Sequence, residues 1–292
     1  MRLLESVRTS SEYLEKAGID DPFVNAELLV FHAAGMDRLA AYIENPEVGR
    51  DLSRKINLLL RRRAKGEPLQ YIIGHVDFLG LKIKVGKGVL IPRPETELLA
   101  QEAVLEINSR EPKAGGRKKS GIEDHARVLD LCTGSGCIAL ALAKEFPNAL
   151  VYGSDISKTA IRYAKMNAEA NGIGNTTFLA GALFGPVKKT VPFDIIISNP
   201  PYIKTSDISG LQREIRDWEP AGALDGGESG LDFYVKIFAE AGAHLREAGI
   251  ILLELGYGQA KAVTKIATKS GFSNITVKKD YAGIGRILRA EK

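Results

Sequence analysis

The chain has 292 residues and a net charge of +4, with 45% hydrophobic and 26% charged residues. These values are typical of a soluble globular protein, and the small net charge argues against an obligate nucleic-acid binder. Two cysteines and four histidines support neither a disulfide framework nor a metal site. The charged start of the sequence and the lack of a long apolar run predict a cytoplasmic protein without a signal peptide or a membrane span.

Residues 1–70 are predicted to form a small helical domain, because their apolar residues recur at helical spacing. We expect three helices, near residues 3–17, 22–34 and 52–64. Gly35 is a plausible stop for the second helix. The third helix ends in the basic run 61–65, which either solvates the helix C-terminus or forms a patch for an acidic partner.

Residues 71–92 are predicted to form a β-hairpin connector, because the hydrophobic period changes to two from Tyr71 and Ile73 onward and glycines interrupt the pattern. The prolines of the next segment favour an extended entry into a helix over about 95–107. Residues 108–126 are polar and rich in Gly, Lys and Arg, which indicates a surface loop.

From Arg127 onward, strands and helices alternate within a domain expected to span residues 93–292. Strands are expected near 128–132, 150–154, 176–180, 194–198, 250–255, 275–279 and 286–289. This alternation predicts an α/β fold with an open, doubly wound, mainly parallel sheet. Glu254, at the end of the fifth strand, could face the ligand crevice, but it is interpreted as an ordinary polar strand end.

A glycine-rich turn follows the first strand of this domain and consists of Cys132, Thr133, Gly134, Ser135 and Gly136. Glycines let the backbone approach a ligand closely, and the helix that follows offers free N–H groups. The second strand ends at a carboxylate that can accept hydrogen bonds from the ribose hydroxyls of a nucleoside. That residue, Asp155, fits NAD and S-adenosylmethionine equally well, and it could instead cap the next helix.

The fourth strand ends in Asn199-Pro200-Pro201-Tyr202, next to the first strand in a sheet of this type. The two prolines stiffen the loop and leave carbonyl oxygens as acceptors. The Asn199 carboxamide oxygen and the Pro200 carbonyl could each accept one N–H of a planar NH2 group, on which Tyr202 could stack. The motif therefore indicates a site for an amide or an aromatic amine.

Several segments together resemble the HemK/PrmC family of release factor glutamine methyltransferases. Beside the NPPY motif these are EPLQYIIG at 67–74, LIPRPETE at 90–97, RDWEP at 216–220 and ALDGGESGLDFY at 223–234. The resemblance covers nearly the whole chain, and IPRPETE together with ALDGGESGLDFY is far more specific than NPPY, which several families share. It implies a helical N-terminal substrate-docking domain that is followed in the sequence by a Rossmann-like class I methyltransferase domain.

The resemblance also implies an activity, namely methyl transfer from S-adenosylmethionine to the N5 amide of the glutamine in the Gly-Gly-Gln motif of class 1 release factors. The product is S-adenosylhomocysteine, and neither a metal nor nucleic acid is required. Cys132–Gly136, Asp155, Leu183 and Asn199 would bind the cofactor. Asn199–Tyr202 would bind the substrate, with Asn199, Pro200 and Tyr202 as catalytic residues. We expect a monomer that embraces the release factor.

Two positions depart from the family pattern. Many relatives have Gly in place of Cys132, where we expect no need for a positive φ and little effect. Many have an acidic residue in place of Ala182, which removes a possible hydrogen bond to the adenine.

Three alternatives remain open: an adenine N6-methyltransferase that uses the same motif, an NAD-dependent oxidoreductase, and a factor-binding module without activity.

Overall fold

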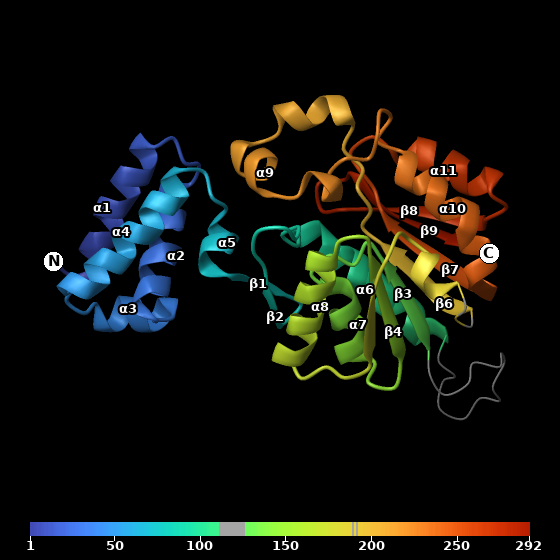
Figure 1. Ribbon diagram of the computed structural model, residues 1–292, viewed down its shortest axis with the longest axis horizontal. Coiled ribbons are helices and arrows are strands. Elements are labelled where there is room, and N and C mark those ends of the chain that lie inside the picture. Colours follow the sequence, from blue (N-terminus) through green and yellow to red (C-terminus); the bar gives the residue numbers. More distant parts are fainter. Residues whose placement is uncertain (111–125, 189, 191) are drawn as a thin grey trace. The chain divides into compact units, whose positions relative to one another are not determined.

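A computed structural model of the chain describes residues 1–110, 126–188, 190 and 192–292 (Figure 1). The chain divides into two compact units. The helical unit contains residues 1–75 and 212–218, and the sheet unit contains residues 76–211 and 219–292. The predicted loop 108–126 lies mostly outside the described residues, although its first three residues belong to a helix.

The helical unit contains six helices among its described residues. They are α1 (Leu3–Lys16), α2 (Pro22–Ala34), α3 (Arg38–Glu44), α4 (Arg50–Ala64), α5 (Leu69–Ile73) and α9 (Arg213–Trp218). Its core consists of apolar side chains from α1, α2, α4 and their neighbours, among them Leu3, Leu29 and Leu60. Gly35 ends α2 with a φ of 68°, a backbone conformation that glycine adopts without strain.

Two predictions for this region are wrong. The short helix α3 was not expected, and Tyr71 and Ile73 lie in α5 rather than in a hairpin strand. The hairpin itself exists as β1 (His75–Phe78) and β2 (Leu81–Lys84). A five-residue helix is too short to show a clear period, and the burial of Tyr71 and Ile72 in tertiary contacts decides its conformation.

Two of the four basic residues in the run 61–65 form ion pairs inside the helical unit. Arg63 is 5% exposed, donates to Asn25 Oδ1 at 2.7 Å and pairs with Glu214 of α9 at 2.6 Å. Arg62 pairs with Glu67 at 2.5 Å. Both guanidinium groups therefore contribute to the packing of the helical unit. The pair between Arg63 and Glu214 also links the distant segment 212–218 to α4.

The sheet unit is built on a seven-stranded sheet with the order β5-β4-β3-β6-β7-β9-β8. The strands are β3 (Arg127–Leu131), β4 (Leu150–Asp155), β5 (Thr176–Ala180), β6 (Phe193–Ser198), β7 (Leu245–Glu254), β8 (Ser273–Lys279) and β9 (Gly285–Glu291). The first five are mutually parallel, and β9 runs antiparallel between β7 and β8. This order confirms the predicted doubly wound α/β fold and the pairing of the fourth predicted strand, β6, with the first, β3.

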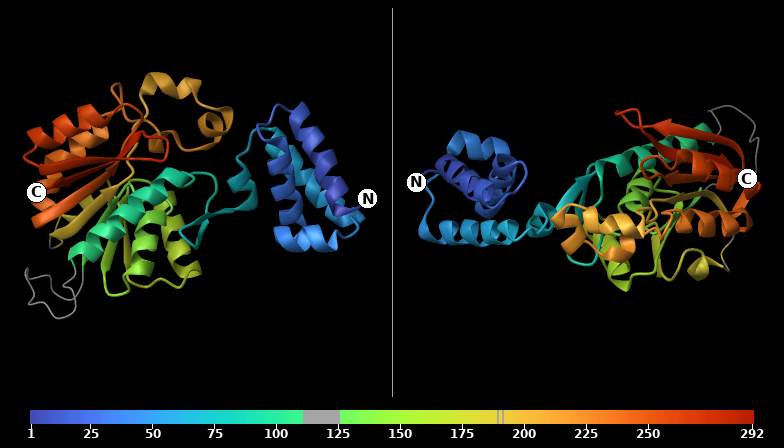
Figure 2. Two further views of the ribbon diagram at one scale, coloured as in Figure 1. Left: turned by 180° about the vertical axis from the view of Figure 1, so that it is seen from behind. Right: turned by 90° about the horizontal axis from the view of Figure 1, so that it is seen from above.

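Helices cover both faces of the sheet, as Figures 1 and 2 show. One face carries α6 (Pro94–Arg110), α7 (Cys137–Glu145) and α8 (Lys158–Ala170), and the other carries α10 (Asp232–His244) and α11 (Ala260–Lys269). Alternate strand residues such as Leu129, Leu131 and Ile196 pack against Tyr234 and Val263 of the second face. Burial on both faces explains why β6 is an uninterrupted apolar run.

Short segments complete the sheet unit without having been predicted: η1 (Gly185–Val187), η2 (Thr205–Gly210) and η3 (Ala221–Ala223). None of the described helices has the length and hydrophobicity that a membrane span requires.

Candidate active site

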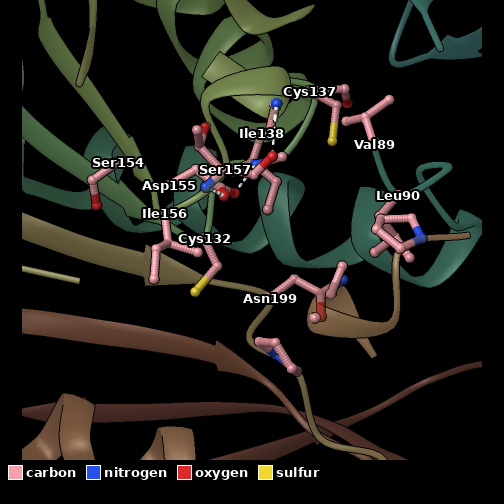
Figure 3. A pocket seen from close by; sticks show the side chains of 18 of the residues that line it. Val89, Leu90, Cys132, Cys137, Ile138, Ser154, Asp155, Ile156, Ser157 and Asn199 are labelled. Carbon is pink, nitrogen blue, oxygen red and sulfur yellow. Dashed lines mark hydrogen bonds between the residues drawn. The ribbon is translucent and has the colours of Figure 1, made fainter. Parts of the chain in front are cut away.

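A cavity opens at the carboxyl ends of β3, β4 and β6, where the order of the parallel strands reverses (Figure 3). Open α/β sheets bind their ligands at such a point. Eight of the residues predicted from the sequence line this cavity: Cys132, Thr133, Gly134, Ser135, Asp155, Leu183, Asn199 and Pro201. In Figure 3, Cys132, Asp155 and Asn199 lie around the same space although they come from three different strand ends.

The glycine turn connects β3 to α7. Gly134 has a φ of 56° and Gly136 a φ of 81°, and Gly136 is the N-cap residue of α7. A Cβ at Gly136 would lie 3.0 Å from the Cβ of Ala164 on α8, so the turn needs glycine for packing as well as for conformation. Gly136 therefore shapes the turn but is not among the lining residues.

Cys132 corrects one prediction. Its φ is 58°, so the position does require a left-handed backbone, which for a residue with a side chain costs roughly 1–2 kcal/mol. The strain persists because the next residue is fixed: Thr133 N donates to Ser154 O at 3.0 Å, and Thr133 Oγ1 donates to the buried Asp130 carboxylate at 2.6 Å. Burial raises the pKa of the Cys132 thiol, so the side chain is an uncharged part of the wall.

Asp155 links the glycine turn to the start of α8. Its Oδ2 accepts from Gly134 N at 2.9 Å, and its Oδ1 accepts from Ser157 N at 2.8 Å. The N-cap of α8 is Ser157, whose hydroxyl accepts from Ala160 N, so the capping alternative for Asp155 is wrong. Burial raises the pKa of Asp155 and the two backbone bonds oppose this shift. Each carboxylate oxygen keeps a lone pair for a further donor.

The part of the cavity that lies after β4 and β5 has apolar walls. Leu183 and Ala182 line it after β5, and Ile156, whose side chain is 76% exposed, lines it after β4. Leu183 has a φ of 43°, and its carbonyl accepts from Ser154 Oγ at 2.9 Å. A flat apolar ring system fits between such walls, and the carboxylate of Asp155 is next to them.

The NPPY segment leaves the end of β6. Asn199 and Pro201 line the cavity, whereas Pro200 is buried and Tyr202 is half-buried outside the lining. Tyr202 is fixed at both ends, because its hydroxyl donates to Glu254 Oε1 at 3.2 Å and its carbonyl accepts from Gln259 Nε2 at 2.9 Å. The Asn199 amide Nδ2 donates to Thr96 Oγ1 at 3.0 Å.

Two residues behind the segment were missed by the sequence reasoning. Glu254 is 2% exposed and accepts from Thr96 Oγ1 at 2.8 Å as well as from Tyr202, so it is no ordinary strand end. Burial raises the pKa of Glu254 to about 7. Two features of the sequence could have indicated these residues. Glu254 is a carboxylate at the end of an apolar strand, and Thr96 lies inside the LIPRPETE motif.

The loop 219–231 braces the segment from another direction. A Cβ at Gly226 would lie 2.7 Å from Tyr202 Cα, so the two backbones are in direct contact. Ile203 N donates to Leu224 O at 3.0 Å, and Gly226 N donates to Ile203 O at 2.7 Å. Glu219 accepts from Ile91 N at 3.1 Å and pairs with Arg93. Within the sheet unit, the LIPRPETE motif, Glu219 and the ALDGGESG motif thus converge on the NPPY segment.

Comparison with known proteins agrees with this geometry. Residues 5–74 match the family model of the PrmC N-terminal domain, and residues 122–217 match a methyltransferase domain. A release factor glutamine methyltransferase of Thermodesulfovibrio yellowstonii is 48% identical over 267 residues, which cover 91% of both chains. The chain belongs to the release factor glutamine methyltransferase family.

Other relatives extend this result. The release factor glutamine methyltransferase of Geobacter sulfurreducens is 42% identical and covers 94% of this chain and 92% of its own. Among solved structures, a methyltransferase from Pyrococcus furiosus aligns with a TM-score of 0.51 and 19% identity, over 82% of this chain and 98% of its own. That likeness shows the methyltransferase fold. The described residues contain no group of three or more His, Cys, Asp or Glu side chains that could hold a metal ion.

Proposed function

We propose that this enzyme transfers a methyl group from S-adenosylmethionine to the N5 amide nitrogen of the glutamine in the Gly-Gly-Gln motif of class 1 release factors. The proposal rests on one observation above all, which is that Asp155 and the glycine turn share a cavity with Asn199. A nucleoside site and an acceptor for an NH2 group then lie within reach of each other. The names of the relatives supply the substrate class.

The donor set of the cavity fits S-adenosylmethionine. We assign the ribose hydroxyls to the remaining lone pairs of Asp155 and the adenine to the apolar walls at Leu183 and Ile156. The turn Cys132–Gly136 would hold the methionine part, with its backbone closely approached because Gly134 has no side chain. When bound, S-adenosylmethionine supplies a methyl group on a positively charged sulfur.

Asn199 and Pro200 would bind the substrate amide. The Nδ2 of Asn199 is engaged by Thr96, so its Oδ1 is the atom available to accept an N–H from the glutamine. The Pro200 carbonyl would accept the second N–H, since a planar NH2 group carries two donors in one plane. Tyr202 would stack on the planar group from outside the lining of the cavity, and it is held rigidly because both its hydroxyl and its carbonyl are hydrogen-bonded.

These acceptors would favour the transition state over the ground state. An amide nitrogen is a weak nucleophile, so in-line positioning against the methyl donor is the main contribution of the site. Positive charge develops on that nitrogen during transfer, and its N–H groups become more acidic. Oδ1 of Asn199 and the Pro200 carbonyl then bind more strongly than before. The N-methylated amide cation loses its proton readily, so no general base is required.

The helical unit is proposed to dock the release factor. Its helix α3 presents Leu39 and Ile43 with exposed fractions of 71% and 74%, and Leu58 of α4 is 62% exposed. Exposed apolar side chains of this size are suited to a protein partner. We propose that the protein acts as a monomer in which the sheet unit carries the chemistry.

The decisive experiment offers radiolabelled S-adenosylmethionine together with a class 1 release factor, duplex DNA or RNA. Label is expected in the release factor alone, at the Gly-Gly-Gln glutamine, and label in DNA or RNA instead would refute the proposal. Asn199→Ala is expected to lower kcat by about 100-fold or more while the cofactor still binds. Asn108→Ala, an exposed position on α6, is the control and should keep wild-type kcat.

A further inference from the structure

A buried carboxyl group joins the two polar side chains of the NPPY segment. Glu254 Oε2 accepts from Thr96 Oγ1 at 2.8 Å, and Glu254 Oε1 accepts from Tyr202 Oη at 3.2 Å. The Thr96 oxygen accepts in turn from Asn199 Nδ2 at 3.0 Å. Glu254 itself is 2% exposed at the end of β7 and is not among the lining residues of the cavity. It can act on a substrate only through its partners.

The hydrogen bonds from Glu254 through Thr96 determine which way the Asn199 carboxamide is oriented. A hydroxyl carries one proton, and an ionised carboxylate can only accept. With Glu254 ionised, the Thr96 proton must point to Glu254, which leaves the Thr96 oxygen as an acceptor. Only the NH2 side of the Asn199 carboxamide can face such an acceptor. The carboxamide oxygen therefore lies on the opposite side, and the two amide orientations, which have nearly the same shape, are no longer equivalent.

We propose that Glu254 is a positioning residue, which through Thr96 turns the oxygen of Asn199 toward the substrate amide and through its second oxygen holds Tyr202. The inference rests on the proposed function for the meaning of that oxygen as the acceptor. Glu254, 55 positions further along the chain, would thus determine the orientation of the Asn199 oxygen.

Protonation of Glu254 reverses the chain of bonds. A proton on Oε2 would be donated to Thr96, whose own proton would then point to Asn199 and require its oxygen. The acceptor would be replaced by an NH2 group on the substrate side. Because burial, first of all, raises the pKa of Glu254 to about 7, this switch falls in an accessible range. Turnover should therefore be lost as the pH falls through about 7.

Other groups face Glu254 from the surrounding elements. Glu95 of α6 raises the pKa of Glu254, whereas Arg286 of β9 lowers it. Arg286 is itself paired with Asp280 at 3.1 Å. Further titratable neighbours are Tyr202, Tyr234 of α10 and Cys137 of α7. Burial raises the pKa of each of these three groups, that of Cys137 to about 12, so they stay protonated while Glu254 titrates.

The first test measures kcat between pH 5.5 and 9, values chosen to bracket about 7. The wild type is expected to lose kcat on the acid side, and Glu254→Gln is expected to weaken this dependence because an amide does not titrate. Asp130, whose pKa burial also raises to about 7, is the same in both proteins. Thr96→Val should lower kcat by about 10-fold or more at saturating substrates, with little change in KM, since one orienting hydrogen bond is removed. Thr96→Ser keeps the hydroxyl and should restore kcat.

Thr268→Val, an exposed change on α11, is the matched control and should behave as the wild type. An unchanged acid limb in Glu254→Gln, or wild-type kcat in Thr96→Val, would overturn the inference. Thermal unfolding of each variant identifies losses that come from stability, and the threonine pair remains informative if the Gln variant fails to fold.

A second readout is independent of activity. The side-chain amide resonances of Asn199, assigned by comparison with Asn199→Asp, should shift with pH near 7 in the protein without cofactor or substrate. They should not shift in Glu254→Gln. If they titrate but no release factor is methylated, the proposed function fails and the positioning role stands. If methylation occurs and neither kcat nor the resonances titrate, the positioning role fails alone.

Discussion

Gly226→Ala is the most direct test of how the loop 219–231 braces the NPPY segment. The added Cβ would lie 2.7 Å from Tyr202 Cα, 2.9 Å from the Pro201 carbonyl oxygen and 2.9 Å from the Tyr202 carbonyl carbon. Ordinary contact begins at 3.4 Å, so the two backbones must separate by several tenths of an ångström. All three atoms belong to the backbone, and no side chain can turn away to relieve the clash.

The hydrogen bonds around Gly226 direct this displacement into the site. Gly226 N donates to Ile203 O at 2.7 Å, so the added methyl group pushes directly on the segment that contains Tyr202. Overpacking of this kind costs about 1–3 kcal/mol of stability. A misplacement of about 1 Å at the reacting groups can cost about 100-fold in rate. The variant should therefore fold, with a lower melting temperature, and lose far more kcat than cofactor affinity.

The assay compares kcat for methylation of a release factor with the calorimetric Kd for S-adenosylhomocysteine and with the urea unfolding curve. Gly210→Ala is the control, because a Cβ there meets nothing within 4 Å. Wild-type kcat in Gly226→Ala would refute the bracing role. A loss of cofactor affinity as large as the loss of kcat would also refute it, because the whole cavity would then have collapsed.

Three further predictions concern binding and stability. Asp155→Asn leaves one carbonyl oxygen for two backbone donors and the ribose, so the Kd for S-adenosylhomocysteine should rise about 10-fold or more in calorimetry. Arg63→Ala removes a buried guanidinium whose partner Glu214 is one-third exposed, and should lower the free energy of urea unfolding of the helical unit by about 1–3 kcal/mol. In the folded protein the pKa of Glu254 is raised from 4.5 to about 7, so the unfolding free energy should fall as the pH rises between these values. The decrease should be at most about 1.4 kcal/mol per pH unit. Glu254→Gln should reduce this dependence of stability on pH.

Each of these three predictions can be contradicted by a specific result. Unchanged Kd in Asp155→Asn would contradict the ribose assignment. Arg54→Ala removes an exposed pair and should change stability by less than about 1 kcal/mol, so equal losses at Arg54 and Arg63 would argue against the buried pair. An identical pH dependence of stability in the wild type and Glu254→Gln would show that Glu254 is not protonated in the folded protein.

Local patterns in the sequence were sufficient for the fold class and the family. The alternation of apolar strands and helices predicted the parallel sheet, because a strand buried on both faces must be apolar throughout and a crossover helix must be amphipathic. The glycine turn and Asp155 follow two predicted strands directly, so the topology of any such sheet brings them together. Asn199 was predicted beside them for the same reason, since β6 pairs with β3.

Only the tertiary structure decided features that depend on distant contacts. The hydrogen bond between Thr96 and Glu254 joins residues 158 positions apart. The sequence around Thr96 is equally compatible with a surface hydroxyl, and the sequence around Glu254 with an exposed strand end. The same holds for α9, which packs with the helical unit through Glu214 and Arg63. The left-handed conformation of Cys132 is imposed by the bonds that fix the neighbouring Thr133. Hydrophobic periodicity reports which face of an element is buried, but not which polar group it meets, because that depends on how the elements pack.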